Sequence, residues 1–68
     1  MKLQDIRPGQ VVTITNGTEI DDYDPAEEWL VDWIDGDRVV VWADRGDCDC
    51  CDGHTTHYSV PPQDLALA

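Results

Sequence analysis

Cysteine and histidine recur at every third position in one short stretch of this 68-residue chain. Cys48, Cys51, His54 and His57 form the pattern CxxCxxHxxH, and Cys50 lies between the first two. Thiolate and imidazole are the ligands that tetrahedral Zn²⁺ prefers, and a CxxC segment lets two sulfurs reach one ion. The sequence therefore predicts a zinc site with these five residues as its candidate ligands, listed in chain order as Cys48, Cys50, Cys51, His54 and His57.

The candidate ligands are unusually close together for a zinc site. Familiar zinc modules separate their ligand pairs by about a dozen residues or more, whereas only Asp52 and Gly53 lie between Cys51 and His54. A metal-free, solvent-exposed loop is therefore the alternative interpretation. The number of cysteines is odd, which disfavours a disulfide framework. Neighbouring aspartates would repel a nucleophilic thiolate, so cysteine-based catalysis is not expected.

Acidic residues dominate the charged composition. Fifteen Asp and Glu residues stand against four Lys and Arg, and the formal net charge is −11 at pH 7. Because phosphate contacts depend on Lys and Arg, we expect neither nucleic acid nor an anionic membrane as a direct ligand. Three interpretations of the acidity stay open: a surface that maintains solubility, a surface that docks on a basic protein, and an imitation of a nucleic-acid backbone.

The length of the chain limits it to one domain, residues 1–68, with no room for a large enzyme cleft. A domain of this size buries only roughly 60% of the surface of its unfolded chain, so a metal or a partner would add useful stability. The N-terminal residues do not have the pattern of a secretory signal, and no run of eighteen apolar residues occurs. These features predict a cytoplasmic protein that is not an enzyme.

Two apolar segments that meet at Asp35-Gly36 predict a β-hairpin. Trp29 to Ile34 and Arg38 to Ala43 are rich in aromatic and β-branched residues, which favour strands. Asp-Gly is typical of a two-residue hairpin turn, because both residues tolerate positive φ. The pairs expected on one face are Trp33 with Arg38, Val31 with Val40, and Trp29 with Trp42. A one-residue bulge would change which valines share a face with the tryptophans.

Further short segments complete an all-β prediction. Gln10 to Thr15 is almost entirely β-branched and Thr55 to Val60 alternates in polarity, so both are expected to be strands. Pro61-Pro62 ends the second of these. Gln63 to Leu65 fits a single 3₁₀ turn, and Ala66 to Ala68 fits a short closing strand.

The order of these elements resembles the SH3-like small β-barrel superfamily. The resemblance rests on a first strand in IRPGQVVTIT, a long loop, a hairpin that begins EEWLV, and the ending HYSVPPQDLAL. It implies a small barrel of four to five antiparallel strands with a short 3₁₀ turn near the C-terminus. In SH3 domains an aromatic residue at the start of the hairpin and a proline of the closing turn help to line a groove for proline-rich peptides. Trp29 and Pro61 or Pro62 occupy the corresponding places here.

Partner-binding residues are expected on the aromatic hairpin and on the acidic loop that precedes it. The tryptophans either fill the core or, with Trp33 beside Arg38, leave an exposed aromatic patch typical of binding anchors. The candidate residues are Trp29, Trp33, Arg38, Trp42, Tyr23, Asp21, Asp22 and Asp24. We therefore expect a protein-interaction module whose partner is a protein, with a basic one favoured by charge. The alternatives are an acidic nucleic-acid mimic, such as a phage or mobile-element inhibitor, and a zinc-dependent accessory protein.

Removal of metal tests the cysteine and histidine pattern. If these residues hold structural zinc, the native protein contains zinc equimolar with the chain, and a chelator lowers the melting temperature because the metal binds the folded state. Elemental analysis and thermal unfolding with and without EDTA measure the two quantities. A control variant that combines Cys48→Ser with Cys51→Ser is expected to be insensitive to EDTA. Native protein without zinc would contradict the prediction.

Overall fold

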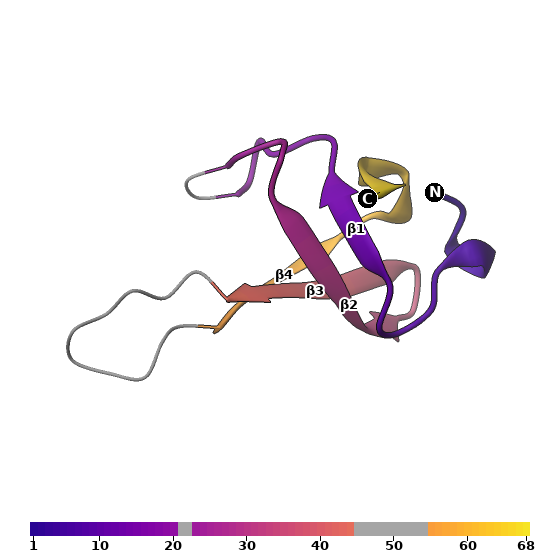
Figure 1. Ribbon diagram of the computed structural model, residues 1–68. Helices are drawn as coiled ribbons and strands as arrows, with labels where there is room; N and C mark the ends of the chain where they lie inside the picture. Colours follow the sequence, from indigo (N-terminus) through magenta and orange to yellow (C-terminus); the bar gives the residue numbers. More distant parts are fainter. Residues whose placement is uncertain (21–22, 45–54) are drawn as a thin grey trace.

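The computed structural model describes residues 1–20, 23–44 and 55–68 of the chain. The described residues form strands and two short 3₁₀ helices, which confirms the all-β prediction. The strands are β1 (Val11–Ile14), β2 (Glu28–Asp35), β3 (Arg38–Asp44), β4 (Thr55–Val60) and β5 (Leu65–Leu67) (Figure 1). The 3₁₀ helices are η1 (Leu3–Asp5), which the sequence pattern did not predict, and η2 (Pro62–Asp64), which was expected one residue later.

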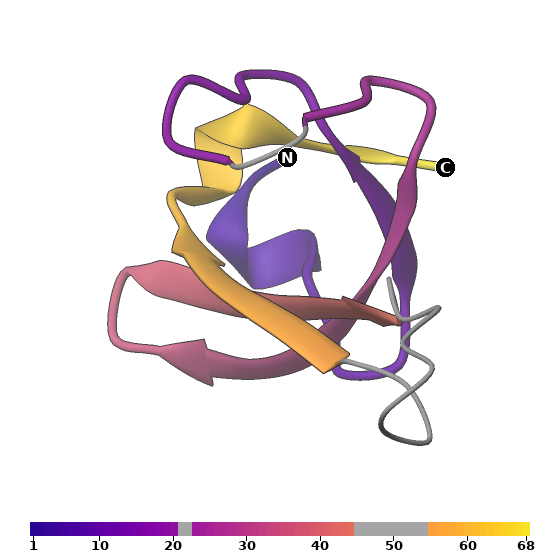
Figure 2. The ribbon, with the colours of Figure 1, turned by 90° about the vertical axis from the view of Figure 1, so that its left-hand side faces the viewer.

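All five strands belong to one antiparallel sheet with the order β4-β3-β2-β1-β5. Strands β2, β3 and β4 follow one another along the chain, whereas β5 returns to pair with β1. Figure 2 shows that the sheet curls, so that its strands surround the middle of the molecule. The two edge strands, β4 and β5, are joined by η2. A short turn is thus enough to connect the opposite edges of the curled sheet.

The β2–β3 hairpin is present, but the predicted turn is wrong by one residue. Asp35 pairs with Arg38, so the two turn residues are Gly36 and Asp37 rather than Asp35 and Gly36. Gly36 has a φ of +61°, which lies in the left-handed region that glycine adopts without a steric penalty. The requirement for glycine therefore falls on the first turn residue. The predicted pairings of this hairpin are wrong because of this shift in the turn and because of an irregularity within β2.

An extra residue in β2 determines which side chains enter the core. The pairing with β3 shifts between Val31 and Trp33, so Asp32 is the additional residue of a β-bulge. The observed pairs near it are Leu30 with Trp42, Val31 with Val41, and Trp33 with Val40. In a regular strand Val31 and Trp33 would share a face. Because of the bulge, Val31 is buried while Trp33 is 50% exposed on the outer face.

The core lies inside the curl of the sheet and is apolar. Trp29 is its largest member, with 1% of its surface exposed, and its ring meets that of Tyr58 edge-on at a centroid separation of 5.6 Å. No polar or charged residue is buried in the described part of the chain. The buried residues are Ile6, Val12, Ile14, Ile20, Trp29, Val31, Val39, Val41, Ala43, Val60 and Leu65. The acidic residues that the structure describes therefore lie outside the core.

Substitution of Gly36 tests the observed turn. We expect Gly36→Ala to lower the free energy of unfolding by about 1–2 kcal/mol, the usual cost of a left-handed conformation for an L-residue. Beyond Gly36 and its two chain neighbours no heavy atom lies within 4 Å of the added Cβ, so the loss reports the backbone conformation. Gly36→Asn is the matched control and should lose less, because asparagine tolerates this region. Urea unfolding of the three proteins measures the difference, and equal losses for the two variants would contradict the assignment.

Candidate protein-binding surfaces

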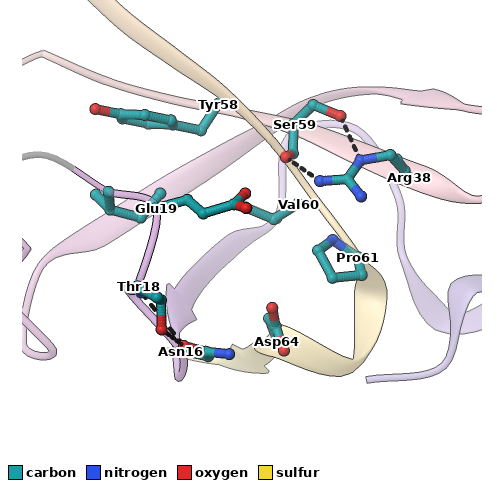
Figure 3. A pocket seen from close by; sticks show the side chains of 10 residues that line it. Asn16, Thr18, Glu19, Arg38, Tyr58, Ser59, Val60, Pro61 and Asp64 are labelled. Atoms are coloured by element: carbon teal, nitrogen blue, oxygen red, sulfur yellow. Dashed lines mark hydrogen bonds between the residues drawn. The ribbon is translucent and has the colours of Figure 1, made fainter.

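A groove of about 390 Å³ lies between the loop after β1 and the segment in which β4 passes into η2 (Figure 3). The start of β3 contributes one basic side chain to it. Its lining residues are Asn16, Thr18, Glu19, Ile20, Arg38, Tyr58, Ser59, Val60, Pro61 and Asp64. The groove thus combines residues that are far apart in the sequence and that the curl of the sheet brings together.

The loop after β1 forms one wall of the groove and is held by its own hydrogen bonds. The side-chain oxygen of Asn16 accepts hydrogen bonds from the backbone N–H of Thr18 at 3.3 Å and from its hydroxyl at 2.6 Å. The N–H of Ile20 donates to the carbonyl of Gly17 at 3.0 Å, and the side chain of Ile20 is buried. These contacts define a turn that leaves Thr18 and Glu19 at the groove.

Tyr23 ties this loop to the end of β1. Its hydroxyl donates a hydrogen bond of 2.5 Å to the carbonyl of Ile14. Its ring lies directly against Gly17, where an added Cβ would overlap the ring atoms. Gly17 is thus required for close approach rather than for an unusual φ. Tyr23, a predicted partner-binding residue, has a structural role here as a support of the groove wall.

The charged side chains of the groove differ in the hydrogen bonds and ion pairs that they form. Arg38 donates hydrogen bonds to Ser59, from Nε to the hydroxyl at 3.0 Å and from a terminal nitrogen to the carbonyl at 2.6 Å. Glu19 extends its carboxylate across the groove toward Val60, and Asp64 lies on the side of η2 (Figure 3). Neither carboxylate forms an ion pair with a residue that the structure describes. The groove therefore offers two negatively charged hydrogen-bond acceptors, while the guanidinium of Arg38 is already bound to Ser59.

The outer face of the sheet forms a second candidate surface. Val11 pairs with Leu30 and Leu30 with Trp42, so these three form a row across β1, β2 and β3. Trp33 pairs with Val40 beside that row. All five are exposed or half-buried. We call Val11, Leu30, Trp33, Val40 and Trp42 the tryptophan face.

Polar and acidic residues border the tryptophan face. Asp32, the extra residue of the bulge, places its carboxylate 3.6 Å from Nε2 of His57 on β4, and about half of each side chain is exposed. Side chains alternate between the two sides of a strand, so a residue two positions from a member of the face also lies on the outer side. Three carboxylates at the ends of β2 and β3 meet this condition. These are Glu28, Asp35 and Asp44. The apolar patch therefore lies within a mainly negative border.

The predicted partner residues divide between the surface and the core. Trp33, Arg38 and Trp42 do share the outer side of the sheet, although Trp33 pairs with Val40 and not with Arg38. Trp29 is buried, so it belongs to the core and not to a partner surface. Asp24 is exposed and its side chain accepts a hydrogen bond from the N–H of Ala26 at 2.9 Å. The two other predicted acidic residues, Asp21 and Asp22, lie outside the described residues.

The groove residues were not among the predicted site residues, apart from Arg38. Two signals in the sequence pointed toward the groove, namely the turn pair Asn16-Gly17 after the first strand and the proline pair after the fourth. Pro61, one of the two prolines to which the resemblance drew attention, lines the groove. Glu19 and Asp64 had no such signal, because aspartate and glutamate are abundant throughout the chain.

Most of the predicted zinc ligands lie outside the described residues. These are Cys48, Cys50, Cys51 and His54. His57 is on β4, paired with Trp42, and its side chain is half exposed on the outer side of the sheet. Among the residues that the structure describes, no three potential ligands lie close enough to hold a metal ion. The zinc site therefore stays a prediction from sequence.

Comparisons of the chain with protein-family models, with curated proteins and with solved structures give no match. Within residues 1–20, 23–44 and 55–68, no helix has the length and apolar character needed to cross a membrane.

A double-mutant cycle tests the support of the groove wall. Tyr23→Phe removes the hydroxyl donor and should lower the free energy of unfolding by about 1 kcal/mol. Gly17→Ala should cost more, because the new Cβ occupies the position of the Tyr23 ring. In a Tyr23→Ala background the same Gly17→Ala change should cost little. Urea unfolding of the wild type, Gly17→Ala, Tyr23→Ala and the double variant gives the four free energies of the cycle. Strictly additive losses would show that Gly17 and Tyr23 do not interact.

Proposed function

We propose that this protein is a non-enzymatic interaction module that binds an extended, basic segment of a partner protein in the groove. The observation that carries the proposal is the pairing of two uncommitted carboxylates, Glu19 and Asp64, with the side chains of Tyr58, Val60 and Pro61 in one groove. Aromatic and proline surface accepts the apolar stems and rings of a peptide. Carboxylates on the two sides select Lys or Arg within it.

The electrostatics of the whole chain support a basic ligand. A net charge of −11 produces a negative potential that attracts cationic segments and repels anionic ones. Of the described residues that line the groove, Arg38 alone is permanently positive, and its two hydrogen bonds to Ser59 keep it at the edge of β4. The negative character near Glu19 and Asp64 is thus preserved. The two carboxylates favour a basic segment over a neutral or acidic one.

The size of the groove supports a peptide rather than a whole protein surface. A volume of about 390 Å³ lies within the range of small-ligand sites, which begins at roughly 300 Å³. An extended chain advances roughly 3.3–3.6 Å per residue, so only a few residues fit. Such a site yields modest affinity. Modest affinity is typical of reversible adaptor contacts.

The resemblance to SH3-like barrels supports the same assignment. We propose this superfamily because the five strands and the turn η2 follow one another along the chain in the order that the sequence predicted. In SH3 domains a proline of the closing turn helps to form the peptide groove, and Pro61 contributes to the groove here. The aromatic contribution differs, because Tyr58 lines the groove while Trp29 packs in the core. The nucleic-acid mimic and the zinc-dependent accessory protein stay predictions without a described contact that favours them.

Charge-neutralising variants test the groove. The probes are short fluorescent peptides that combine proline with Lys or Arg, and matched peptides with glutamine at the basic positions. We expect binding of the basic peptides only, and we expect Glu19→Gln and Asp64→Asn each to weaken it by about two- to fivefold, as for exposed ion pairs. Fluorescence anisotropy measures the dissociation constants. Higher salt should weaken peptide binding by the wild type more than binding by a variant that combines Glu19→Gln with Asp64→Asn.

The matched control is Asp5→Asn, which removes the same charge from an exposed residue outside the groove. It should leave the affinity unchanged. If Asp5→Asn weakens binding as much as the groove variants, only net charge matters and the groove is not the site. Failure of every basic peptide to bind would also contradict the proposal.

A further inference from the structure

We infer that the tryptophan face is a second docking surface, separate from the groove, for a folded partner that presents an apolar patch surrounded by Lys and Arg. The face consists of neighbouring apolar side chains on three adjacent strands, whereas scattered single apolar residues are normal on a protein surface. Trp33 is its most prominent member, with half of its surface exposed. An exposed tryptophan in an apolar patch is typical of a residue that dominates binding energy.

The bulge in β2 makes this exposure a specific feature of the fold. Without the extra residue Asp32, Trp33 would continue the inward series of Trp29 and Val31. With Asp32 present, the side chain of Trp33 lies beside Val40 on the outer side, where it does not contribute to the core. Bulges frequently re-aim a side chain next to a functional site. The same change brings the carboxylate of Asp32 to the border of the face.

Charge decides among the possible occupants. A second copy would bring the acidic border of one face against that of the other, and each chain carries a net charge of −11. A nucleic acid or an anionic membrane would meet the same repulsion. A protein patch with basic residues around an apolar centre matches both parts of the surface. Its Lys or Arg side chains would reach the carboxylates listed above at the strand ends and the bulge, namely Glu28, Asp32, Asp35 and Asp44.

The face and the groove are separable by mutation. Trp33 and Val40 do not line the groove, and Glu19 and Asp64 do not belong to the face. Arg38 lies at the boundary, because its side chain crosses from the start of β3 to Ser59 on β4. Variants of Trp33 therefore report on the face alone. Failure of the groove proposal would leave this inference intact, and the reverse also holds.

The experiment uses an amphipathic helical peptide of Leu and Lys as the probe, and two-dimensional NMR spectra of the isotopically labelled full chain as the readout. We expect the largest chemical-shift changes at the tryptophan face, including the indole N–H of Trp33 and Trp42. Trp33→Ala should weaken binding at least about tenfold, the loss typical of an aromatic anchor. A charge-matched peptide with Ser in place of Leu should bind weakly, because it lacks the apolar contribution.

The matched control is Leu67→Ala, which truncates an apolar residue that is 66% exposed on β5 and lies outside the face. It should bind the probe as the wild type does. Shift changes spread over the acidic residues, with equal affinity for Trp33→Ala and wild type, would overturn the inference. Analytical ultracentrifugation of the protein alone should show a monomer. A dimer that Trp33→Ala disrupts would assign the face to a second copy and also overturn it.

Discussion

One extra residue in β2 determines which side chains of the β2–β3 hairpin face the core and which face outward. Asp32 interrupts the regular alternation, so that Val31 points into the core and the next aromatic residue, Trp33, points out. The backbone of Val31 forms both of its hydrogen bonds with the segment before β1. Its N–H donates to the carbonyl of Gln10 at 2.9 Å, and its carbonyl accepts from the N–H of Gly9 at 2.8 Å. A bulge also increases local twist. The exposed face therefore depends on this position, and the added twist favours the curl of the sheet around the core.

The strands could be predicted from the sequence, but their register could not. Aromatic and β-branched runs bounded by Gly and Pro identify strands because such side chains suit a pleated surface. The choice between Asp35-Gly36 and Gly36-Asp37 as the turn depends on a small difference in backbone energy, and both satisfy the local pattern. A bulge has no sequence signature of its own here. It is favoured only when Trp29, Val31, Val39 and Val41 are packed together in three dimensions.

The candidate sites likewise include residues that the sequence predicted and residues that it did not. Trp33, Arg38 and Trp42 were predicted as surface partners because an aromatic hairpin with one cation suggests an anchor, and they do share the outer side. Trp29 looked equivalent in sequence, yet it lies before the bulge and is buried. The groove was harder to predict, because its walls are brought together only when β5 pairs with β1 and η2 crosses between the edges of the sheet. No local pattern encodes such long-range closure.

The placement of charge explains how so acidic a chain keeps a folded core and still has selective surfaces. The described carboxylates lie in loops, turns, strand ends and the bulge, where water screens them from one another. The interior is apolar, so no buried charge needs compensation. Among the described residues of the two surfaces, Arg38 alone has a permanent positive charge, and Ser59 holds it. Both surfaces therefore present apolar groups beside carboxylates, a combination that selects basic amphipathic partners over the many other molecules that a purely acidic surface would attract.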